Sequence, residues 1–221
     1  MKIIEQTHEI LSLPDQGLTL LEKAGRTCYK SEDKITQDSA ERFVEMLVRK
    51  GHHAMIEFGD IMVKFVTNRG VTHELVRHRH CSFAQESTRY VKYDGQMEFI
   101  KPVWCEEHLL GTWSEQSPVL PVLPVPPGRS LAEQLWLSAM ERAETDYKTL
   151  LQNGWKAQQA REILPNSLKT EIVMKANIRE WRHVFALRCA KASHPQMVEL
   201  MRPLLKEVQK KVPVVFDDLI F

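Results

Sequence analysis

The feature that most restricts the fold lies in the middle of the chain, where five of the ten residues in 118–127 are proline. Proline fixes φ and has no backbone N–H, so this stretch cannot form a helix and is unfavourable as a central strand. We expect an extended surface connection of the polyproline II type, and the alternative is a docking segment for a partner protein. The core must therefore be built from the residues on either side of it.

Helical patterns dominate the rest of the 221 residues. The strongest covers 130–152, where apolar residues from Leu131 and Leu135 to Leu150 recur at helical spacing, and Gly154 ends it. Further helices are expected in 17–29, 36–53, 71–78, 155–164, 179–193 and 195–212. Asp38 or Ser39 is the expected N-cap of the helix within 36–53, which Gly51 ends.

Strand patterns are shorter and fewer. Residues 2–5 and 56–66 have strand-like composition, and 92–103 is expected to hold two strands around an Asp-Gly turn. Residues 169–177 fit either a strand or a helix. This balance predicts a mixed α/β fold with more helix than strand, in which helices pack on a sheet. The length suits one domain over 1–221.

Composition excludes several functional classes. The formal net charge is +1, so no global field draws the chain to nucleic acid or to a membrane surface. No run approaches the ~20 apolar residues that cross a bilayer. The four cysteines form no Cys-x-x-Cys pair, and the N-terminus carries no apolar signal segment. We therefore expect a cytoplasmic protein with reduced thiols.

Positive charge is concentrated locally in the stretch RHRHCSFAQESTRY, Arg77 to Tyr90. Arginine binds phosphate through charge-assisted, bidentate hydrogen bonds. The arginines that could hold phosphate are Arg77, Arg79, Arg89, Arg161 and Arg188. Ser87 adds a hydroxyl, and Gln85 adds an amide that can bind a base edge or a ribose. The stretch predicts a site for an anionic small molecule or nucleotide.

Two other interpretations compete with this one. Five histidines between positions 52 and 80, together with Cys81, could bind a metal ion, but His-x-His-Cys without a second ligand pair is a weak zinc pattern. If 77–81 were extended, the two histidines of the motif would share one face and its two arginines the other. The stretch could also be a solvated charged loop, although its interleaved hydroxyl, amide and aromatic residues disfavour that. We predict no metal.

The motif resembles the signature of a known family. Arg77-His78-Arg79, seven further residues and then Ser87, completed by STRY, match the pattern of the flavin-dependent thymidylate synthases, the ThyX family. Other segments that resemble the family are GHHAMIEF before the motif and AREILPNSLKTE, ANIREWRHVFALR and SHPQMVELM after it. The likeness covers roughly 15–30, 40–105 and 155–205, so the proline-rich part at about 114–129 resembles an insertion.

The resemblance implies a reaction and its partners. Members of the family methylate dUMP to dTMP. The carbon comes from methylenetetrahydrofolate and the hydride from FAD that NADPH reduces, without a cysteine nucleophile. Cys81 is then expected to be a packing residue. Members are homotetramers with active sites at subunit interfaces, an arrangement that a closed symmetric assembly repeats.

Site residues are implied by their matching positions in the motifs. The implied dUMP contacts are Glu74, Arg77, Gln85, Glu86, Ser87, Thr88, Arg89, Arg161 and Arg188. The implied FAD contacts are His52, Arg77, His78, Arg79, Asn177, Arg179 and His183. Arg188 is the implied catalytic residue, because its guanidinium would stabilise negative charge at N3 and O2 of the uracil ring. Ser87 has no adjacent base, so we expect it to donate a hydrogen bond to dUMP and not to act as a nucleophile.

Four positions depart from the family pattern. Ala84 stands where asparagine is frequent, Glu74 where glutamine is common, and His183 where asparagine usually contacts the flavin. The spacing from Arg188 to His194 is longer than usual, so His194 has no assigned role. Ala84 and Glu74 motivate a rival prediction, a flavin- or nucleotide-binding homologue that has lost methyl transfer.

Overall fold

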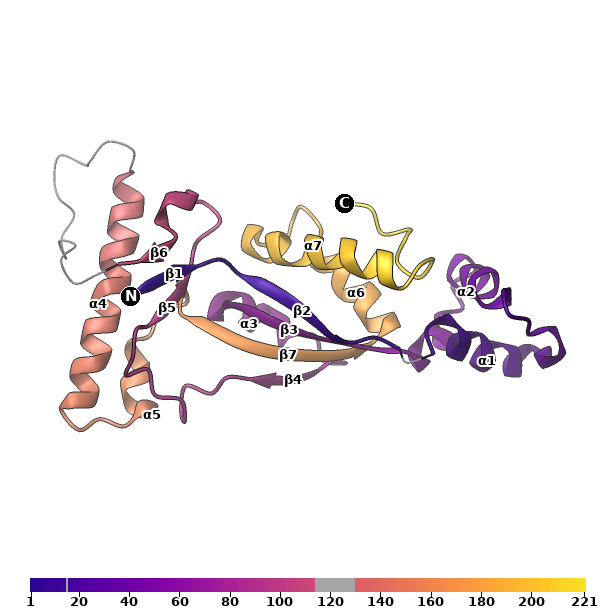
Figure 1. Cartoon of the computed structure of the whole chain (residues 1–221), viewed down its shortest axis with the longest axis horizontal. Helices are drawn as coiled ribbons and strands as arrows, with labels where there is room; N and C mark the ends of the chain where they lie inside the picture. The colour runs from indigo at the N-terminus through magenta and orange to yellow at the C-terminus, as the bar shows by residue number, and fades with distance from the viewer. Residues whose placement is uncertain (15, 114–129) are drawn as a thin grey trace. The chain divides into compact units, whose positions relative to one another are not determined.

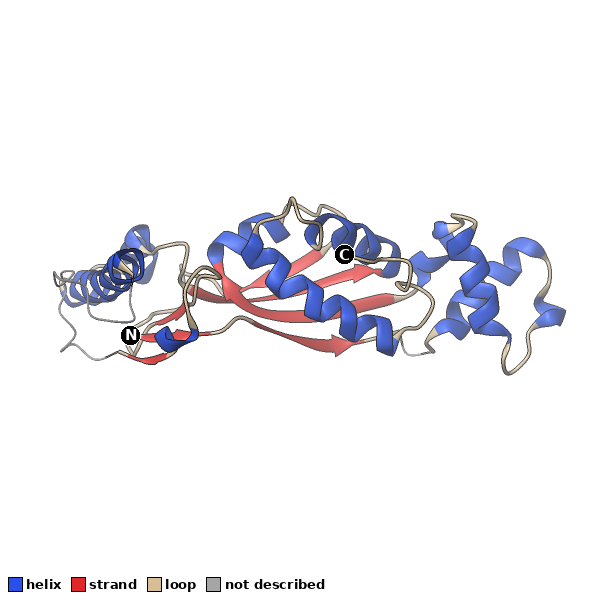
Figure 2. Ribbon diagram, turned by 90° about the horizontal axis from the view of Figure 1, so that it is seen from above, coloured by secondary structure: helices blue, strands red, loops and turns tan. Residues whose placement is uncertain are grey.

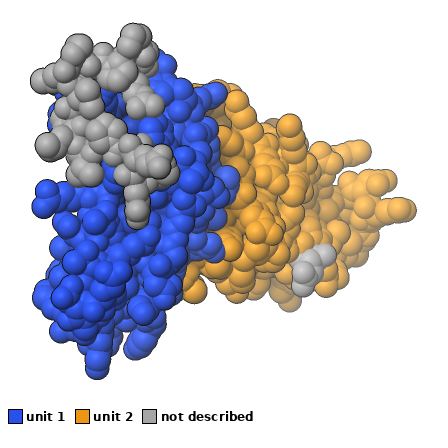
Figure 3. All heavy atoms as spheres, turned by 60° about the vertical axis from the view of Figure 1, so that its left-hand side comes forward, with its two compact units in different colours: residues 1–7, 66–74, 85–172 blue, residues 8–65, 75–84, 173–221 orange. Residues whose placement is uncertain are grey.

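The computed structural model describes residues 1–14, 16–113 and 130–221. The proline-rich stretch 118–127 and the expected insertion at 114–129 therefore lie outside the described residues. The chain forms two compact units, which are coloured separately in Figure 3. Unit 1 contains 1–7, 66–74 and 85–172, and unit 2 contains 8–65, 75–84 and 173–221. The assignment of 1–221 to a single domain stays a prediction.

Four strands form the larger sheet, in the order β2-β3-β7-β4. They span Thr7–Ser12 (β2), Asp60–Asn68 (β3), Ser82–Gln85 (β4) and Lys169–Asn177 (β7). Every second side chain of β3 is buried, as expected for a strand that turns one face toward a core. The two long strands, β3 and β7, each contribute residues to both units.

In unit 2, the helices α6 (Ile178–Arg188) and α7 (Pro195–Lys211) lie on the same side of the sheet (Figure 1, Figure 2). Trp181 of α6 is fully buried, and its indole N–H donates to the Ile61 carbonyl of β3 at 3.0 Å. The Trp181 ring packs against Phe185 with the centroids 5.3 Å apart. The apolar face of α6 is therefore anchored to β3 by packing and by a buried hydrogen bond.

Two further helices of unit 2, α1 (Leu18–Tyr29) and α2 (Ser39–Arg49), pack against each other. Gly25 permits their close approach, because a Cβ at this position would lie 2.5 Å from the Phe43 ring. Gly51 follows α2 with a φ of 72°, a left-handed conformation that favours glycine after a helix. Short 3-10 helices cover Glu32–Lys34 and His53–Phe58.

Unit 1 has its own sheet, in which β1 (Lys2–Ile4) pairs in parallel with β5 (Glu98–Ile100) and antiparallel with β6 (Gly111–Thr112). The long helix α4 (Leu131–Gln152) begins with a capping box formed by Ser130 and Glu133. Buried side chains of α4, β1 and β5 form one apolar cluster. The shorter elements of the chain are α3 (Arg69–Leu75), α5 (Ala157–Ala160) and 3-10 helices at Glu107–Leu109 and Arg161–Ile163. Within the described residues, no helix has both the length and the apolar character that crossing a membrane requires.

The expected helices are present with shifted ends, although only part of 155–164 is α-helix, and 169–177 is strand β7. The hairpin expected over 92–103 is wrong, because only Glu98–Ile100 forms a strand and its partner is β1. Tyr93 instead donates its hydroxyl hydrogen to Glu86 at 2.7 Å. The strand expected over 56–66 begins at Asp60, since a 3-10 helix occupies the residues before it.

The apolar face predicted for 130–152 is partly wrong. Leu131 and Leu135 are 46% and 51% exposed, whereas the carboxylate side chain of Glu144 is buried. Glu144 accepts a hydrogen bond from the Met97 N–H at 3.1 Å and pairs with Lys148 at 2.7 Å. These partners offset the cost of burying its charge, so hydrogen bonding overrides hydropathy on this face of α4.

We predict that Trp181→Phe lowers the free energy of unfolding by about 2 kcal/mol, because it removes buried ring area and the hydrogen bond to Ile61. Trp155→Phe is the matched control. Trp155 is 45% exposed, so its substitution should change stability by less than about 0.5 kcal/mol. Urea unfolding followed by far-UV circular dichroism measures both variants, and equal losses would contradict the packing assigned to α6.

Candidate functional site

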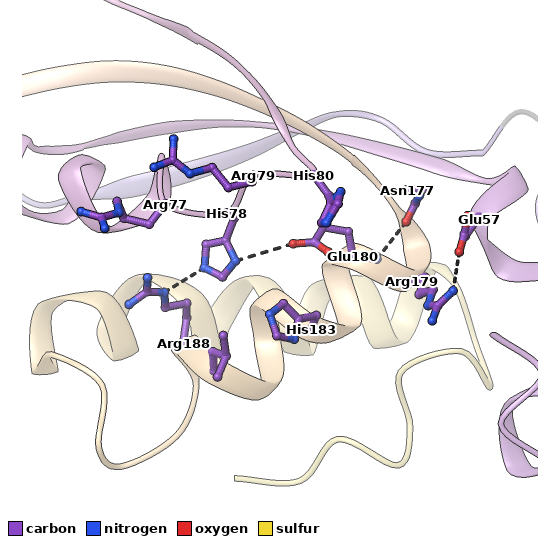
Figure 4. A pocket seen from close by; sticks show the side chains of 11 residues that line it. Glu57, Arg77, His78, Arg79, His80, Asn177, Arg179, Glu180, His183 and Arg188 are labelled. Atoms are coloured by element: carbon purple, nitrogen blue, oxygen red, sulfur yellow. Dashed lines mark hydrogen bonds and ion pairs between the residues drawn. The ribbon is translucent and has the colours of Figure 1, made fainter. Parts of the chain in front are cut away.

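A pocket of about 860 Å³ lies in unit 2, between the turn that carries the RHRH sequence and helix α6 (Figure 4). This volume falls in the range of about 300–1,000 Å³ that is usual for small-molecule sites. Its lining residues are Glu57, Arg77, His78, Arg79, His80, Asn177, Arg179, Glu180, His183, Leu187 and Arg188. All of them belong to unit 2.

The RHRH sequence forms a turn and not an extended segment. The His78 N–H donates to the Leu75 carbonyl at 3.0 Å, and the Cys81 N–H donates to the His78 carbonyl at 3.2 Å. The turn buries His78, which is 5% exposed, and leaves Arg77, Arg79 and His80 exposed. The two histidines of the motif therefore differ in environment, and the alternation expected for an extended segment does not apply.

Helix α6 supplies the opposite wall of the pocket. Asn177 ends β7 and caps α6, because its side-chain oxygen accepts from the Glu180 N–H at 2.8 Å. Asn177, Glu180, His183 and Leu187 then recur at spacings of three and four, which places them on one face of the helix. This face lines the pocket, while Trp181 lies on the buried face.

His78 is held as a neutral ring at the centre of the site. The Arg188 Nε–H donates to His78 Nε2 at 2.9 Å, and the Glu180 carboxylate lies 3.7 Å from His78 Nδ1. Burial, followed by the positive charge of Arg188 and the neighbouring His183, lowers the pKa of His78 to about 4. His78 is therefore uncharged at neutral pH and accepts a hydrogen bond from Arg188.

The walls of the pocket are strongly cationic. Four arginines line it, against two carboxylates, those of Glu57 and Glu180. Arg179 pairs with Glu57 at 2.6 Å, and both side chains are about half exposed, so this ion pair is weak and can exchange for a ligand anion. The excess of guanidinium groups favours a ligand that carries phosphate.

Three lining residues could in principle bind a metal ion, since one ligand atom each of His78, Glu180 and His183 lie within 4.8 Å of one another. This group differs from the His-x-His-Cys pattern of the sequence, because it contains neither His80 nor Cys81. The guanidinium of Arg188 contacts His78 and would repel a cation. This contact disfavours a metal ion in the pocket, and the absence of a metal stays a prediction.

Cys81 is a thiol with little nucleophilic character. Burial and the adjacent Glu180 carboxylate raise the pKa of Cys81 to about 12, so almost no thiolate is present at neutral pH. Its Sγ lies 4.0 Å from Glu180 Oε1. All four cysteines are described and present as thiols.

Six of the seven residues that the sequence assigned to FAD line this one pocket; they are Arg77, His78, Arg79, Asn177, Arg179 and His183. The seventh, His52, lies elsewhere in unit 2, where its Nδ1 is hydrogen-bonded to the Tyr29 hydroxyl. The six residues that line the pocket come from two segments, 77–79 and 177–183, about 100 positions apart in the chain. Their assignment to FAD stays a prediction.

The residues that the sequence assigned to dUMP are divided between the units. Arg77 and Arg188 belong to unit 2. Glu74, Gln85, Glu86, Ser87, Thr88, Arg89 and Arg161 belong to unit 1. Their assignment to dUMP also stays a prediction.

Within unit 1, several of these side chains already have internal partners. The Gln85 amide donates to Thr72 at 2.9 Å and to Thr170 at 3.3 Å. The Glu86 carboxylate accepts from Tyr93, and its backbone N–H donates to the Glu171 carbonyl.

The remaining dUMP candidates of unit 1 differ in exposure. Thr88 is buried, whereas Arg89 is exposed and its guanidinium stacks over the Tyr90 ring at 5.3 Å. The Arg161 side chain is 39% exposed and lies 3.5 Å from Glu162. Arg89 and Arg161 are therefore the accessible cations of this set in unit 1.

Sequence reasoning left Glu57, His80, Glu180 and Leu187 without a role in the pocket. Glu180 and Leu187 could have been found, because they continue the helical spacing of Asn177 and His183. Glu57 carries no such signal, since it lies in a 3-10 helix where a strand was expected.

The chain is similar to known proteins along most of its length. The sequence profile of the family described as thymidylate synthase complementing protein matches residues 9–214. The flavin-dependent thymidylate synthase of Corynebacterium aurimucosum is 32% identical over 202 residues, which are 90% of this chain and 78% of that protein. The flavin-dependent thymidylate synthase of Mycolicibacterium vanbaalenii is 31% identical over 209 residues, 92% of this chain and 80% of that protein.

A solved structure shares the fold. The UMP/dUMP methylase PolB from Streptomyces cacaoi, in a crystal structure with 5-Br dUMP, superposes with a TM-score of 0.75 and 20% sequence identity. The superposition covers 98% of this chain and 96% of that chain. At this identity the likeness confirms the mixed α/β fold alone. The match over 9–214 and the two relatives confirm the family predicted from the RHR motif: this chain belongs to the thymidylate synthase complementing protein family of flavin-dependent thymidylate synthases.

Proposed function

We propose that the protein is a flavin-dependent thymidylate synthase that methylates dUMP to dTMP. Methylenetetrahydrofolate would supply the carbon, and NADPH would reduce the flavin. The observation that carries this proposal is the cationic pocket lined by six of the seven residues assigned to FAD. The names of the relatives from Corynebacterium and Mycolicibacterium support the same activity.

The residues present in the pocket fit FAD chemically. A pyrophosphate requires preplaced cationic donors, which Arg77, Arg79 and Arg179 offer. Ring nitrogens and carbonyls require hydrogen-bond donors and acceptors, which Asn177 and His183 offer. Bound FAD would supply the hydride, while the protein would bind and orient it and exclude water.

The protein's part in catalysis is assigned to Arg188. Its guanidinium is a permanent cation that would lie against the uracil ring and stabilise negative charge at N3 and O2 as C5 becomes nucleophilic. The hydrogen bond from its Nε–H to His78 restricts the orientation of the guanidinium. Arg89 and Arg161 would bind the phosphate of dUMP, and Ser87 would donate a hydrogen bond to the nucleotide.

The working assembly is proposed to be a homotetramer, on the pattern of the family. Closed symmetry would repeat each site and complete it with residues of neighbouring copies. The near-neutral charge of the chain argues against nucleic acid as a partner, and the cytoplasm suits an enzyme of nucleotide metabolism.

We predict that the purified protein binds FAD and shows flavin absorbance. Incubation with FAD followed by gel filtration and an absorbance spectrum measures this. Tritium release from 5-labelled dUMP, with methylenetetrahydrofolate and NADPH present, then separates an active synthase from a homologue without methyl transfer. A protein that gains no colour from added FAD would contradict the flavin assignment, and flavin without tritium release would favour the rival.

Arg188→Ala should lower the rate of tritium release by at least about 100-fold, because it removes a preplaced charge from the transition state. The variant should keep its flavin absorbance, since three other arginines line the pocket. Arg142→Ala is the control, because Arg142 is 71% exposed on α4, where its Nε lies 3.3 Å from the Asp146 carboxylate and outside the pocket. Near wild-type turnover in Arg188→Ala would refute the catalytic assignment.

Ser87→Ala should weaken dUMP binding by about fivefold, the loss of one hydrogen bond worth about 1 kcal/mol, without abolishing turnover. Ser82→Ala is the matched control, since Ser82 is an exposed serine of the same segment. Isothermal titration with dUMP and the tritium assay give both quantities. Complete loss of turnover with unchanged dUMP affinity would instead identify Ser87 as a nucleophile.

A further inference from the structure

Glu180 is a carboxylate inside a pocket whose other features favour anions. Its side chain is 12% exposed, and the pocket that it lines contains four arginines. A carboxylate here weakens the attraction for a phosphorylated ligand, because like charges repel in a partly desolvated site. We therefore expect the pocket to contain a neighbouring partner group that the Glu180 carboxylate stabilises.

That partner is His78, which lies between Glu180 and Arg188 (Figure 4). A guanidinium has only donors, so the 2.9 Å contact from Arg188 Nε requires a lone pair on His78 Nε2. In a neutral imidazole the proton must then be on Nδ1. Nδ1 faces Glu180 Oε1 at 3.7 Å, and an ionised carboxylate has only acceptors. The two neighbours therefore favour the same tautomer.

Other contacts keep both groups in place. The Glu180 backbone N–H is capped by Asn177 at 2.8 Å, and Cys81 Sγ lies 4.0 Å from the same carboxylate oxygen that faces His78. His183 packs edge-on against the His78 ring with the centroids 5.9 Å apart. The low pKa of His78 agrees with a ring that stays neutral between these groups.

We propose that Glu180 is a positioning residue for the reaction: it holds the proton of His78 on Nδ1, so that Nε2 remains an acceptor for Arg188. Glu180 would thus act on the guanidinium through the imidazole, as a carboxylate behind a histidine does in hydrolase triads. This inference rests on the proposed function only for its consequence on turnover. The protonation of His78 can be observed independently of it.

The test substitutes Glu180→Gln, which preserves size but introduces an amide that can donate to Nδ1. His78 could then carry its proton on Nε2, and this hydrogen would oppose the Arg188 Nε–H. Glu41→Gln is the matched control, because Glu41 is likewise an acidic residue in the first turn of a helix, but is exposed on α2. Glu41→Gln measures the effect on helix stability of losing a first-turn carboxylate that has no contact with His78.

Magic-angle-spinning NMR of the full-length protein, labelled with 15N in its histidine side chains, gives the protonation of each ring nitrogen. The His78 signals are identified by their absence in His78→Gln. We expect the wild type and Glu41→Gln to hold the His78 proton on Nδ1 only. In Glu180→Gln we expect a second population with the proton on Nε2. An unchanged single Nδ1–H form in Glu180→Gln would overturn the proposal.

Turnover should follow the tautomer. We expect Glu180→Gln to lower kcat for tritium release by about 10- to 100-fold, because a small misplacement of a catalytic group costs rate steeply. Its flavin absorbance should match that of Glu41→Gln. Glu57→Gln removes the same charge from the same pocket without facing His78. An equal fall in kcat for Glu57→Gln would attribute the effect to pocket charge and overturn the proposal.

The two hypotheses fail in different ways. A wild-type protein that binds FAD but releases no tritium would refute the synthase function, and the NMR comparison would still decide whether Glu180 holds the His78 proton. A changed tautomer with unchanged turnover would refute the positioning role alone.

Discussion

The hydrogen bond between the Glu180 N–H and the Asn177 side chain fixes the point where β7 ends and α6 begins, and the pocket depends on that point. Asn177 is the last residue of the strand and the N-cap of the helix. Because the helix starts there, its 3.6-residue period places Glu180 and His183 on the pocket side and Trp181 on the buried side. A start one residue later would rotate every side chain by about 100°.

The pocket illustrates how a chain of formal net charge +1 can favour an anion. Four guanidinium groups line one pocket, two from a turn and two from a helix, so positive charge is concentrated there although the chain as a whole is nearly neutral. If acidic side chains paired with all four arginines, the pocket would lose its preference for anions. The two carboxylates are placed where each serves a single group, Glu57 beside Arg179 and Glu180 beside His78. Each carboxylate therefore changes the electrostatic potential mainly around its own neighbour, and the pocket keeps an excess of positive charge.

Much of the fold could be predicted from local patterns, and the errors have a common origin. The spacing of apolar residues located the helices, because a helix brings residues three and four positions apart onto one face. The Asp-Gly turn signal failed at 92–103, where Glu98–Ile100 pairs with β1 near the N-terminus and no local signal specifies that partner. In the site, the resemblance to the family's motifs identified Asn177 and His183 as well as Arg77 to Arg79. Glu180 was missed because its role depends on its contact with His78 at 3.7 Å, and the sequence does not show that these two residues meet.

The RHRH sequence shows why residue type alone does not assign a role. His78 and His80 are two positions apart and have the same chemistry, yet the turn buries the first and exposes the second. Burial lowers the pKa of His78, which makes it a reliable acceptor for Arg188 at neutral pH. A protonated imidazole has no lone pair to offer and would repel the same guanidinium. The turn between α3 and β4, and not the histidine content of the motif, therefore determines which ring can orient the arginine.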